Sequence, residues 1–294
     1  MGKVLIIRSK KGSLYANMIR SYLAKKGLGS YLTTWEKDQL RQNIKKYGLT
    51  PKNTLIHART AGRHVNDNLV WLESLGFKIL NTSGALRLTS NKYLAQVVAK
   101  KNGIPVTPSY NIAKGDLVRL KKLLKKNKNL ILKPIYSRGR GKFCQKIELG
   151  DSLKIIKEKF ESVPGNYVLV QKFVNYKKLI RAIVIDDKVL KEAFTYDVPV
   201  DSWKCSVCMN PNVKRYKDTR GNLSALALKT AKAFGSKIGF IDFFETKDGK
   251  FIFNEVNTAC SLRYHETVTS VPIHEYIGNF LIKSLNERPI LVQQ

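Results

Sequence analysis

Apolar residues in the first part of the chain occur in short blocks, and the spacing alternates between that of strands and that of helices. Continuous apolar runs predict buried strands, and apolar positions three and four residues apart predict helices between them. The strands are expected at 4–8, 31–33, 54–58 and 78–81, and the helices at 13–26 and 66–75. Because strands that alternate with helices favour a parallel sheet, residues 1–85 are predicted to form a small α/β domain.

The rest of the chain mixes longer apolar strands with lysine-rich amphipathic helices. The strands are expected at 130–135, 143–148, 167–174, 180–185 and 189–196, and the helices at 89–101, 116–126, 223–234 and 273–285. Thr89 or Ser90 would cap the first of these helices. Residues 197–222 are polar and irregular, and a connection of that length is usually functional.

The stretch 239–257 has the pattern of a β-hairpin. Two apolar runs flank Asp248-Gly249, a dipeptide typical of a two-residue turn. A turn centred there pairs Lys247 with Lys250, and counting outwards places Asp242 opposite Glu255.

The polar positions of this hairpin predict a metal site. Asn257 lies on the same face as Glu255, because side chains alternate along a strand. Opposed carboxylates such as Asp242 and Glu255 destabilise a buried sheet unless something compensates them. Two carboxylates and an amide oxygen are ligands that Mg²⁺ accepts. The alternative is a solvated hairpin edge with acidic decoration.

Composition places the chain among large globular proteins. It has 294 residues, of which 43% are hydrophobic, so a disordered protein is excluded. No apolar run approaches the roughly 18 residues that cross a membrane, and the run from Val4 to Ile7 is too short for a signal peptide. A cytoplasmic protein without membrane contact is therefore expected. The four cysteines are too few for a disulfide framework, and Cys205 and Cys208 alone do not predict a zinc site.

Charge adds a second constraint. The chain has 53 Lys and Arg residues against 22 Asp and Glu residues, a formal net charge of +31. This excess predicts either a solvated basic surface or an anionic partner, such as nucleic acid, a ribosomal surface or an acidic protein. The lysines are spread over the chain with a local cluster at 121–128, so charge alone does not identify the partner.

Two segments carry cations in positions that suggest anion binding. Lys133 lies inside the apolar strand 130–135, where an ammonium group needs a partner. The glycine-rich loop 137–142 follows it, and glycines let backbone N–H groups approach phosphate oxygens. The spacing is not that of a Walker P-loop.

Three further cationic side chains follow the strand at 54–58. His57, Arg59 and Arg63 lie near its carboxyl end, where open α/β sheets commonly bind ligands. Ordinary loop charges are an equally good interpretation of these residues.

The order of these features resembles that of the ATP-grasp superfamily. The closest likeness is to amino-acid ligases of the RimK type, which add glutamate to a ribosomal protein, and of the LysX type, which act on an acidic carrier protein. Each matching segment is weak alone, but in this order they are specific and cover nearly the whole chain. They are Asn81-Thr-Ser-Gly-Ala-Leu, Ser90-Asn-Lys, Leu132-Lys-Pro, Ser137-Arg-Gly-Arg-Gly, Val170-Gln-Lys-Phe-Val, Gly239-Phe-Ile-Asp and Asn254-Glu-Val-Asn.

The resemblance implies an ATP-grasp fold preceded by a small parallel α/β domain, an α/β (α+β) protein overall. Residues 1–85 would form the N-terminal domain. Residues 86–165 would form a central subdomain with the phosphate-binding glycine loop. Residues 166–294 would form a C-terminal subdomain with the adenine strand and the metal-binding hairpin.

The resemblance also implies a role for individual residues. Lys92 and Lys133 would contact the ATP phosphates, and the loop residues Ser137, Arg138, Gly139 and Gly141 would close over them. Gln171, Lys172, Phe173 and Val174 would hold adenine. Arg181 and Lys204 would face the reacting phosphate or acyl group. Mg²⁺, with Mn²⁺ as a substitute, would be held by Asp242, Glu255 and Asn257.

The chain departs from the family pattern at a few positions. Lys172 stands where Glu is usual, and Leu179 stands where an acid usually holds the ribose. The segment after Asn257 lacks the usual Ser-Pro-Gly. These departures concern nucleotide affinity and substrate identity, and they leave the metal and phosphate residues in place.

Two functions are weighed against each other. The first is an ADP-forming ligase that joins an amino acid or other small carboxylate substrate to an acidic peptide, protein or carrier through an acyl phosphate. Phosphoryl transfer requires positioning and charge neutralisation, which lysines, a cationic loop and Mg²⁺ supply. The alternative is a non-catalytic nucleic-acid- or ribosome-binding protein on the same scaffold. Family members are often homo-oligomers.

Overall fold

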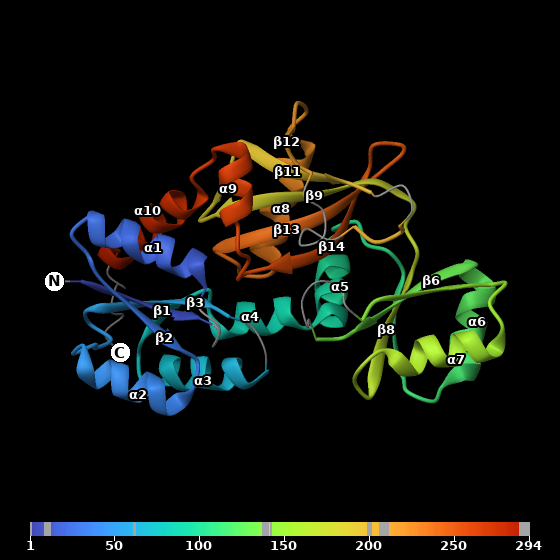
Figure 1. The fold of residues 1–294 in the computed structure, drawn as a ribbon, viewed down its shortest axis with the longest axis horizontal. Helices are drawn as coiled ribbons and strands as arrows, with labels where there is room; N and C mark the ends of the chain where they lie inside the picture. Colours follow the sequence, from blue (N-terminus) through green and yellow to red (C-terminus); the bar gives the residue numbers. More distant parts are fainter. Residues whose placement is uncertain are drawn as a thin grey trace.

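The N-terminal strands form the parallel α/β unit that the sequence predicts. The computed structural model describes residues 2–8, 13–60, 63–136, 141, 143–198, 202–205 and 212–287. The strands are β1 (Lys3–Arg8), β2 (Gly29–Thr34), β3 (Thr54–Arg59) and β4 (Lys78–Leu80), in the parallel order β2-β1-β3-β4. Helices α2 (Lys37–Lys46) and α3 (Arg63–Ser74) cover one face, and α1 (Leu14–Lys25) covers the other (Figure 1).

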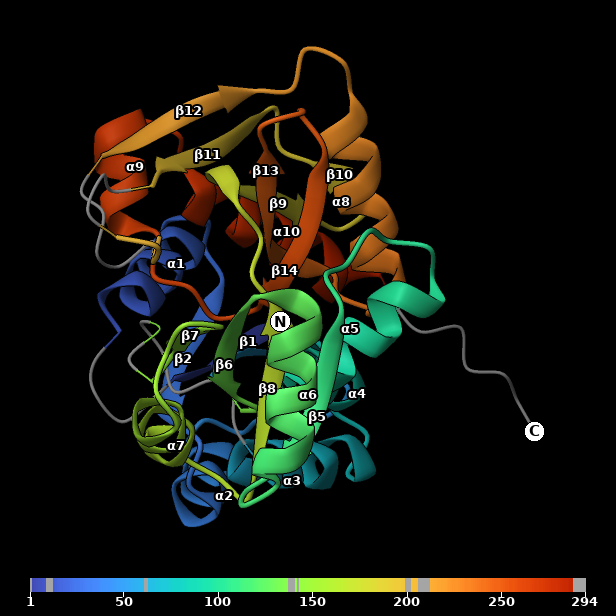
Figure 2. The ribbon, with the colours of Figure 1, turned by 90° about the vertical axis from the view of Figure 1, so that its right-hand side faces the viewer.

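A central antiparallel sheet follows. Its strands are β5 (Ser109–Ala113), β6 (Asn129–Pro134), β7 (Gln145–Glu148) and β8 (Tyr167–Lys172), in the order β5-β8-β6-β7. Helices α6 (Leu117–Asn127) and α7 (Leu153–Ser162) pack on one face of it, as Figure 2 shows. Leu130 and Leu132 of β6 belong to that core, so Lys133 lies on the opposite face.

Strand pairing assigns β8 to this central sheet, although the sequence analysis grouped it with the residues after 165. It pairs with β5 and with β6 through five residue pairs each. The proposed division into domains otherwise stays a prediction.

The C-terminal sheet carries the predicted hairpin. Its strands are β9 (Tyr176–Ile185), β10 (Lys188–Val189), β11 (Glu192–Asp197), β12 (Val213–Lys217), β13 (Ile238–Thr246) and β14 (Phe251–Asn257). The order is β12-β11-β9-β13-β14, with β10 paired to β9. Strand β12 thus occupies part of the region 197–222 that the sequence pattern left irregular.

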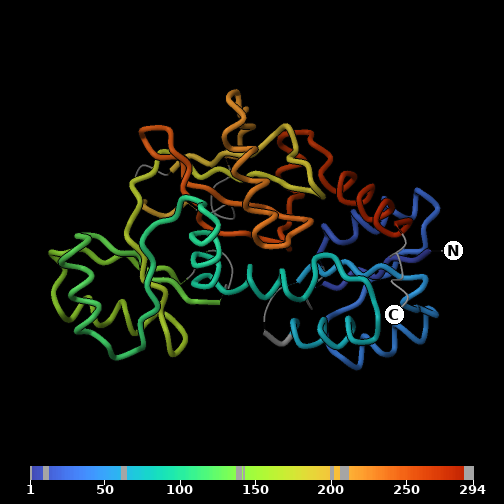
Figure 3. Tube along the Cα trace, turned by 180° about the vertical axis from the view of Figure 1, so that it is seen from behind, coloured from blue at the N-terminus to red at the C-terminus, as the bar shows by residue number. Residues whose placement is uncertain are grey.

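Helices cover both faces of this sheet. Helix α5 (Lys92–Lys101) and helix α8 (Asn222–Ala233) pack on one face. Helix α9 (Arg263–Thr269) and helix α10 (Ile273–Asn286) lie on the other, where α10 also packs against α1 and the N-terminal sheet. In Figure 3 the N-terminal and central sheets lie at opposite ends, with the C-terminal sheet above them. No described helix is both long and apolar enough to cross a bilayer.

The helix predicted at 89–101 is divided in two. Helix α4 (Ser83–Ser90) ends at Asn91, whose backbone is extended at φ −95° and ψ 103°. Oδ1 of Asn91 accepts a hydrogen bond from the amide of Leu94 at 2.9 Å. Asn91 is therefore the N-cap of the helix that follows, and neither Thr89 nor Ser90 takes the predicted capping role. Lys92 therefore begins α5.

Asn81 connects the N-terminal unit to the start of β13. Its Oδ1 accepts from the amides of Lys237 at 2.8 Å and Ile238 at 2.9 Å, and its Nδ2 donates to the carbonyl of Ile238 at 2.8 Å. The side chain is buried. These bonds fix the strand that carries Asp242 against the residues that follow β4.

Replacing Asn81 by Ala is expected to lower the free energy of unfolding by about 2 kcal/mol, because it leaves buried backbone groups without partners. Urea unfolding followed by circular dichroism measures the change. The exposed Asn222, exchanged for Ala in the same way, is the control. Equal stability of the two variants would contradict a role for Asn81 in joining the two units.

Candidate active site

The hairpin of β13 and β14 brings the two predicted carboxylates together. Asp242 pairs directly with Glu255, which confirms the predicted register at this point. On its other side Asp242 pairs with Arg181 of β9. Asn257 lies two residues from Glu255 on the same face, so four polar side chains from adjacent strands converge.

The turn of the hairpin differs from the prediction. Lys250 faces Thr246 instead of Lys247, and Gly249 adopts φ 75° in the intervening loop. The loop is therefore one residue longer than a two-residue turn. Asn254 forms a bulge with no partner across the hairpin, which shifts the register back by one residue. The two offsets cancel, which is why the predicted pairing of the carboxylates still holds.

Arg181 and Asp242 form a buried bidentate ion pair. Nε and Nη2 of Arg181 each donate to one carboxylate oxygen at 2.7 Å. The two side chains are 5% and 3% exposed, so both charges depend on each other for compensation. Although burial alone would lower it, Asp242 raises the pKa of Arg181 well above its ordinary value. Burial raises the pKa of Asp242, and the guanidinium opposes that rise.

Lys92 at the start of α5 forms an ion pair with Oε2 of Glu255. Burial alone would raise the pKa of Glu255, but the ammonium of Lys92 lowers it to about 2. Burial would likewise lower the pKa of Lys92, and the carboxylate raises it instead. Both groups are therefore charged at neutral pH.

The geometry fits a bound divalent cation. Nδ2 of Asn257 lies 3.2 Å from Oδ2 of Asp242 and 3.1 Å from Oε1 of Glu255, so both carboxylates reach one point. Rotation of the amide by 180° would turn its oxygen towards that point. Among the described residues no group of three or more His, Cys, Asp or Glu side chains could hold a metal ion, so Asn257 would have to complete the site. Two carboxylates and an amide suit Mg²⁺, which keeps waters and substrate oxygens as its other ligands.

Lys133 approaches the same place from the central sheet. Its Nζ donates to Oδ1 of Asn254 at 3.2 Å and lies 6.0 Å from the centre of the Phe244 ring. Burial lowers its pKa. No ion pair joins Lys133 to a carboxylate within the described parts of the chain, so this cation can compensate an incoming anion. Asn254 itself was not among the predicted site residues, because only the bulge turns it towards Lys133.

Several predicted nucleotide contacts lie outside the described residues. Ser137, Arg138 and Gly139 belong to that group. Gly141 is described, and its φ of 60° is a conformation that favours glycine. Their proposed contact with phosphate stays a prediction.

The predicted adenine segment lies at the end of β8. Gln171 is buried, and its Nε2 donates to Oγ of Ser109 at 2.8 Å. Lys172 is exposed, and its backbone bonds to Pro108 and Thr107. The ammonium of Lys146 lies over the ring of Phe173, 4.7 Å from the centre of the ring. Val174, half-buried, directly follows Phe173 in the connection from β8 to β9.

Lys204, the other predicted catalytic residue, contacts an aromatic ring. Its Nζ lies 5.1 Å from the centre of the Trp203 ring. No ion pair links it to Asp242 or Glu255 in the part of the chain that the structure describes. Leu179, noted as a departure from the family pattern, is buried in the core beside Tyr196.

The N-terminal sheet brings buried cationic residues to the same side. Arg59 is 4% exposed, and it donates through Nη2 to the carbonyl oxygen of Cys260, which follows β14. His57 is fully buried, and its Nδ1 bonds to the carbonyl of Leu80 at 3.1 Å. The side chain of Arg63 lies outside the described residues.

Buried His57 predicts a loss of stability in mild acid. Burial, together with Arg59, lowers its pKa from 6.5 to about 3, so the unfolded chain binds a proton below pH 6.5 that the folded chain does not. Stability is therefore complete above pH 6.5 and falls by about 1.4 kcal/mol per pH unit below it, until the pH reaches the folded pKa. Urea unfolding at pH 7.5, 6.0 and 5.0 measures this dependence.

The matched variant is His57→Asn, which keeps an N–H donor for Leu80. It should lose this share of the pH dependence, while His265, whose pKa burial also lowers to about 3, keeps its own share. Identical pH dependence of the variant and the wild-type protein would show that His57 titrates normally in the fold.

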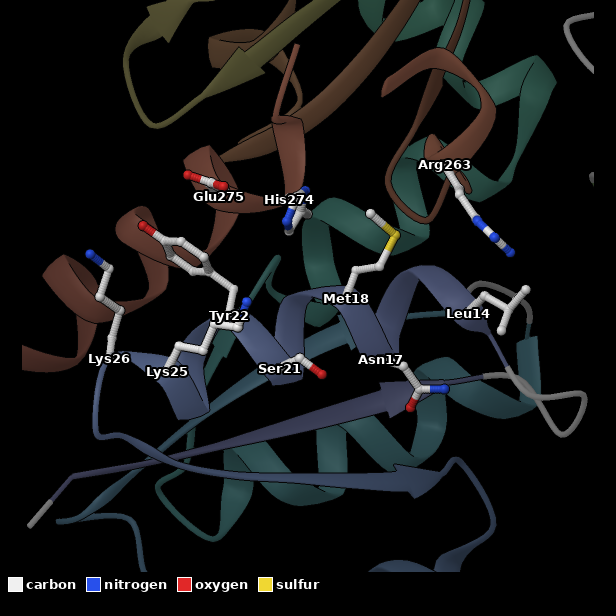
Figure 4. A pocket seen from close by; sticks show the side chains of 10 residues that line it. All are labelled: Leu14, Asn17, Met18, Ser21, Tyr22, Lys25, Lys26, Arg263, His274 and Glu275. Carbon is white, nitrogen blue, oxygen red and sulfur yellow. The ribbon is translucent and has the colours of Figure 1, made fainter. Parts of the chain in front are cut away.

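A groove of about 700 Å³ opens between α1 and the helices α9 and α10. Figure 4 shows Lys25 and Lys26 at one end and Arg263 at the other, with the apolar side chain of Met18 between them. His274 in its wall bonds to Glu266, which in turn accepts from the hydroxyl of Tyr15. Residues of the groove are thus two hydrogen bonds away from Tyr15, whose ring lies 4.8 Å below Arg59.

Comparison with known families shows which family the chain belongs to. Residues 89–281, more than half of the chain, match the family model of the RimK-like ATP-grasp domain. The chain belongs to the RimK-like ATP-grasp family. The sequence resemblance is thereby confirmed, and so are the ATP-grasp fold and the preceding parallel sheet.

Individual relatives agree with the RimK-like assignment. The glutamate–LysW ligase ArgX of Sulfolobus acidocaldarius is 25% identical over 213 residues, which cover 71% of this chain and 74% of that one. The α-aminoadipate–LysW ligase LysX of Sulfurisphaera tokodaii is 26% identical over 209 residues, covering 70% and 72%. A peptide-associated ATP-grasp ligase of Chryseobacterium gregarium has the same fold, with a TM-score of 0.73, 16% identity and 97% coverage of both chains.

This RimK-like protein is therefore an ATP-dependent, ADP-forming carboxylate–amine ligase. Magnesium is the metal typical of the family. That the hairpin carboxylates, Lys92 and Lys133 carry this chemistry stays a prediction.

Proposed function

We propose that this ligase joins an amino acid to an acidic peptide, protein or carrier through an acyl phosphate. The observation that supports it best is the convergence on one point of Asp242, Glu255 and Asn257, flanked by Lys92 and Lys133. These residues come from three separate segments, and a purely structural ion-pair cluster would not leave Lys133 without a carboxylate.

The reaction has two balanced steps. A carboxylate oxygen attacks the γ-phosphorus of ATP, the bond to the β-phosphate oxygen breaks, and ADP leaves. The amine then attacks the acyl carbon, phosphate leaves with the bonding electrons, and the amine loses a proton. Both steps depend on positioning and on neutralising phosphate charge.

The chain's own residues would divide this work. Lys133 and Lys92 would neutralise phosphate oxygens from opposite sides. Asp242, Glu255 and Asn257 would hold Mg²⁺, which supplies charge neutralisation at the transferred phosphoryl group when bound. Arg181 keeps Asp242 ionised and oriented through its bidentate contact. The loop at 137–142 and the segment 171–174 would contact phosphate and adenine.

The acidic acceptor would bind in the groove between α1 and the helices α9 and α10. The groove is lined by three cationic side chains, those of Lys25, Lys26 and Arg263. It is also lined by the carboxylate of Glu275 and by His274, which bonds to Glu266. Relatives named as LysW ligases act on glutamate and α-aminoadipate, so we take these two amino acids as the first small substrates for this chain.

The test is a ligation assay. The protein is incubated with ATP, Mg²⁺, L-glutamate or L-2-aminoadipate, and acidic peptides that end in glutamate. ADP release that requires both substrates, with a peptide mass increased by one amino-acid residue, is the expected result. Mn²⁺ is expected to replace Mg²⁺.

Absence of nucleotide binding, together with tight and steeply salt-dependent binding of RNA, would overturn the proposal. It would favour the polyanion-binding alternative instead. The substitutions Lys25→Glu and Lys26→Glu reverse the charge at one end of the groove. They should weaken the binding of the acidic peptide and leave the affinity for ATP unchanged.

A further inference from the structure

Arg59 is a buried cation that forms no ion pair with a carboxylate of the described residues. It ends β3 on the face that packs towards α1 and the C-terminal sheet, and only 4% of it is exposed. Nη2 bonds to the carbonyl of Cys260, whereas Nε and Nη1 have no hydrogen-bond partner among the described residues. A buried guanidinium with two unused donors is expensive unless an anion binds to it.

Arg8 lies directly beside it. Arg8 ends β1, and the parallel register pairs it with Arg59, so the two cations project from the same face. The Nε atom of Arg8 is also buried without a partner in the described part of the chain. Like charges on adjacent strands repel, which makes this edge of the sheet a second indication of an anion site.

The carboxylates near these cations do not bond to the free donors of Arg59. Glu36 lies two residues beyond Thr34, the β2 partner of Arg8, and the charge of Glu266 opposes the lowering of the pKa of Arg59 by burial. Among the described residues neither carboxylate bonds to Nε or Nη1 of Arg59. Residues 9–12 and 61–62, which follow the two strands, contain no Asp or Glu. Glu266 accepts from Tyr15, from the amide of His274 and from its ring, so its oxygens are already used. Tyr15 presents only its ring to Arg59. An incoming anion would therefore meet two unused donors of Arg59.

The position of Arg59 connects it with the reaction centre. Its partner Cys260 follows Asn257 by three residues, a stretch of chain that spans at most about 10 Å. The Cys260 thiol interacts electrostatically with Arg181, Asp242 and Glu255 as well as with Arg59. Lys92 and Lys133 approach the carboxylates from α5 and the central sheet, so Arg59 lies on the N-terminal-domain side of the site.

We propose that Arg59, with Arg8 beside it, binds a carboxylate of the amino-acid substrate that takes no part in the reaction. This proposal rests on the function proposed above. A planar guanidinium with free donors matches a carboxylate, and the phosphates have their own cations in Lys92 and Lys133. Arg59 would thus select amino acids by a charged group remote from the new amide bond.

The test compares Arg59→Met with Arg87→Met, a substitution of an exposed arginine on α4. KM and kcat are measured by ADP release with L-glutamate, with its α-amide L-isoglutamine and with its side-chain amide L-glutamine. Calorimetric titration of the same three compounds into each protein gives affinities that do not depend on turnover.

Arg59→Met is expected to weaken the binding of L-glutamate, with KM and the dissociation constant both rising by about 10- to 100-fold. This is the change that the loss of a charge-assisted hydrogen bond usually causes. kcat and the KM for ATP should stay within a few-fold, and Arg87→Met should match the wild-type protein. The variant should also lose the preference for glutamate over one of the two amides. If the variant loses the preference for glutamate over isoglutamine, Arg59 binds the α-carboxylate. If it loses the preference for glutamate over glutamine, Arg59 binds the side-chain carboxylate.

Unchanged glutamate affinity in Arg59→Met, or an equal loss for all three compounds, would overturn the subsite. So would a wild-type protein that binds none of them. Binding without ADP formation would overturn the proposed function and leave the subsite standing. Because Arg59 forms no ion pair with a described carboxylate, the unfolding temperature of Arg59→Met should stay close to that of the wild-type protein.

Discussion

Replacing Glu255 by Gln is expected to lower ATP turnover on the order of 1000-fold, the effect of losing a charge aimed at the transferred phosphoryl group. Glu255 faces Asp242 across the hairpin and holds the ammonium of Lys92. The amide keeps the shape of the side chain but removes its charge, so metal affinity and the position of Lys92 both suffer. ADP release at saturating ATP, over a range of Mg²⁺ concentrations, measures the loss.

Glu245→Gln is the matched control, since Glu245 lies on the same hairpin, further towards its tip. It should turn over ATP like the wild-type protein, and both variants should show the same circular dichroism spectrum. Undiminished turnover in Glu255→Gln would remove the hairpin from the metal site, whatever the family.

Arg181→Met is expected to destabilise the protein by about 3–5 kcal/mol, because it leaves the carboxylate of Asp242 buried without a counter-charge. The side chain of Asp242 is 3% exposed, and both its oxygens accept from Arg181. Urea unfolding at neutral pH measures the change, and activity should be lost as well.

The double variant Arg181→Met with Asp242→Leu separates the two effects. Removing both charges should restore most of the lost stability, because neither charge is left uncompensated, yet it cannot restore a metal ligand. A double variant as unstable as Arg181→Met would indicate that the packing of the arginine, and not its charge, supports the sheet.

The sequence predicted the elements whose apolar face is wide. Helices α1, α3, α8 and α10 and the strands of the N-terminal sheet follow their apolar spacing. Helix α2 was not predicted, because it buries only Leu40 and Asn43 and is otherwise polar. Helix α7 similarly rests on Ile156 and Phe160, and strand β12 is mostly exposed. Such elements depend on the core that covers them more than on their own pattern.

The site was predictable where it is local. The opposition of Asp242 and Glu255 follows from strand alternation within one hairpin, even though the turn and the bulge each depart from it by one residue. The ion pair of Lys92 with Glu255 joins residues 163 positions apart, and only the family resemblance pointed to Lys92. No local pattern predicts the contact of Asn254 with Lys133, because it depends on how two sheets meet.

The cations and carboxylates of this site belong to separate sheets. Lys133 lies on the central sheet and Glu255 on the C-terminal one. The segment between α5 and β5, which leads into the central sheet, contacts β14: the amide of Phe253 donates to the carbonyl of Pro105 at 2.8 Å. Phe253 also forms a β-bridge with Val106. A nucleotide bound by both Lys133 and the hairpin would connect the central sheet to the C-terminal sheet. Its position would then depend on how these two sheets are placed relative to each other. A substitution at Pro105 or Val106 is therefore expected to change turnover without removing any residue that contacts the nucleotide.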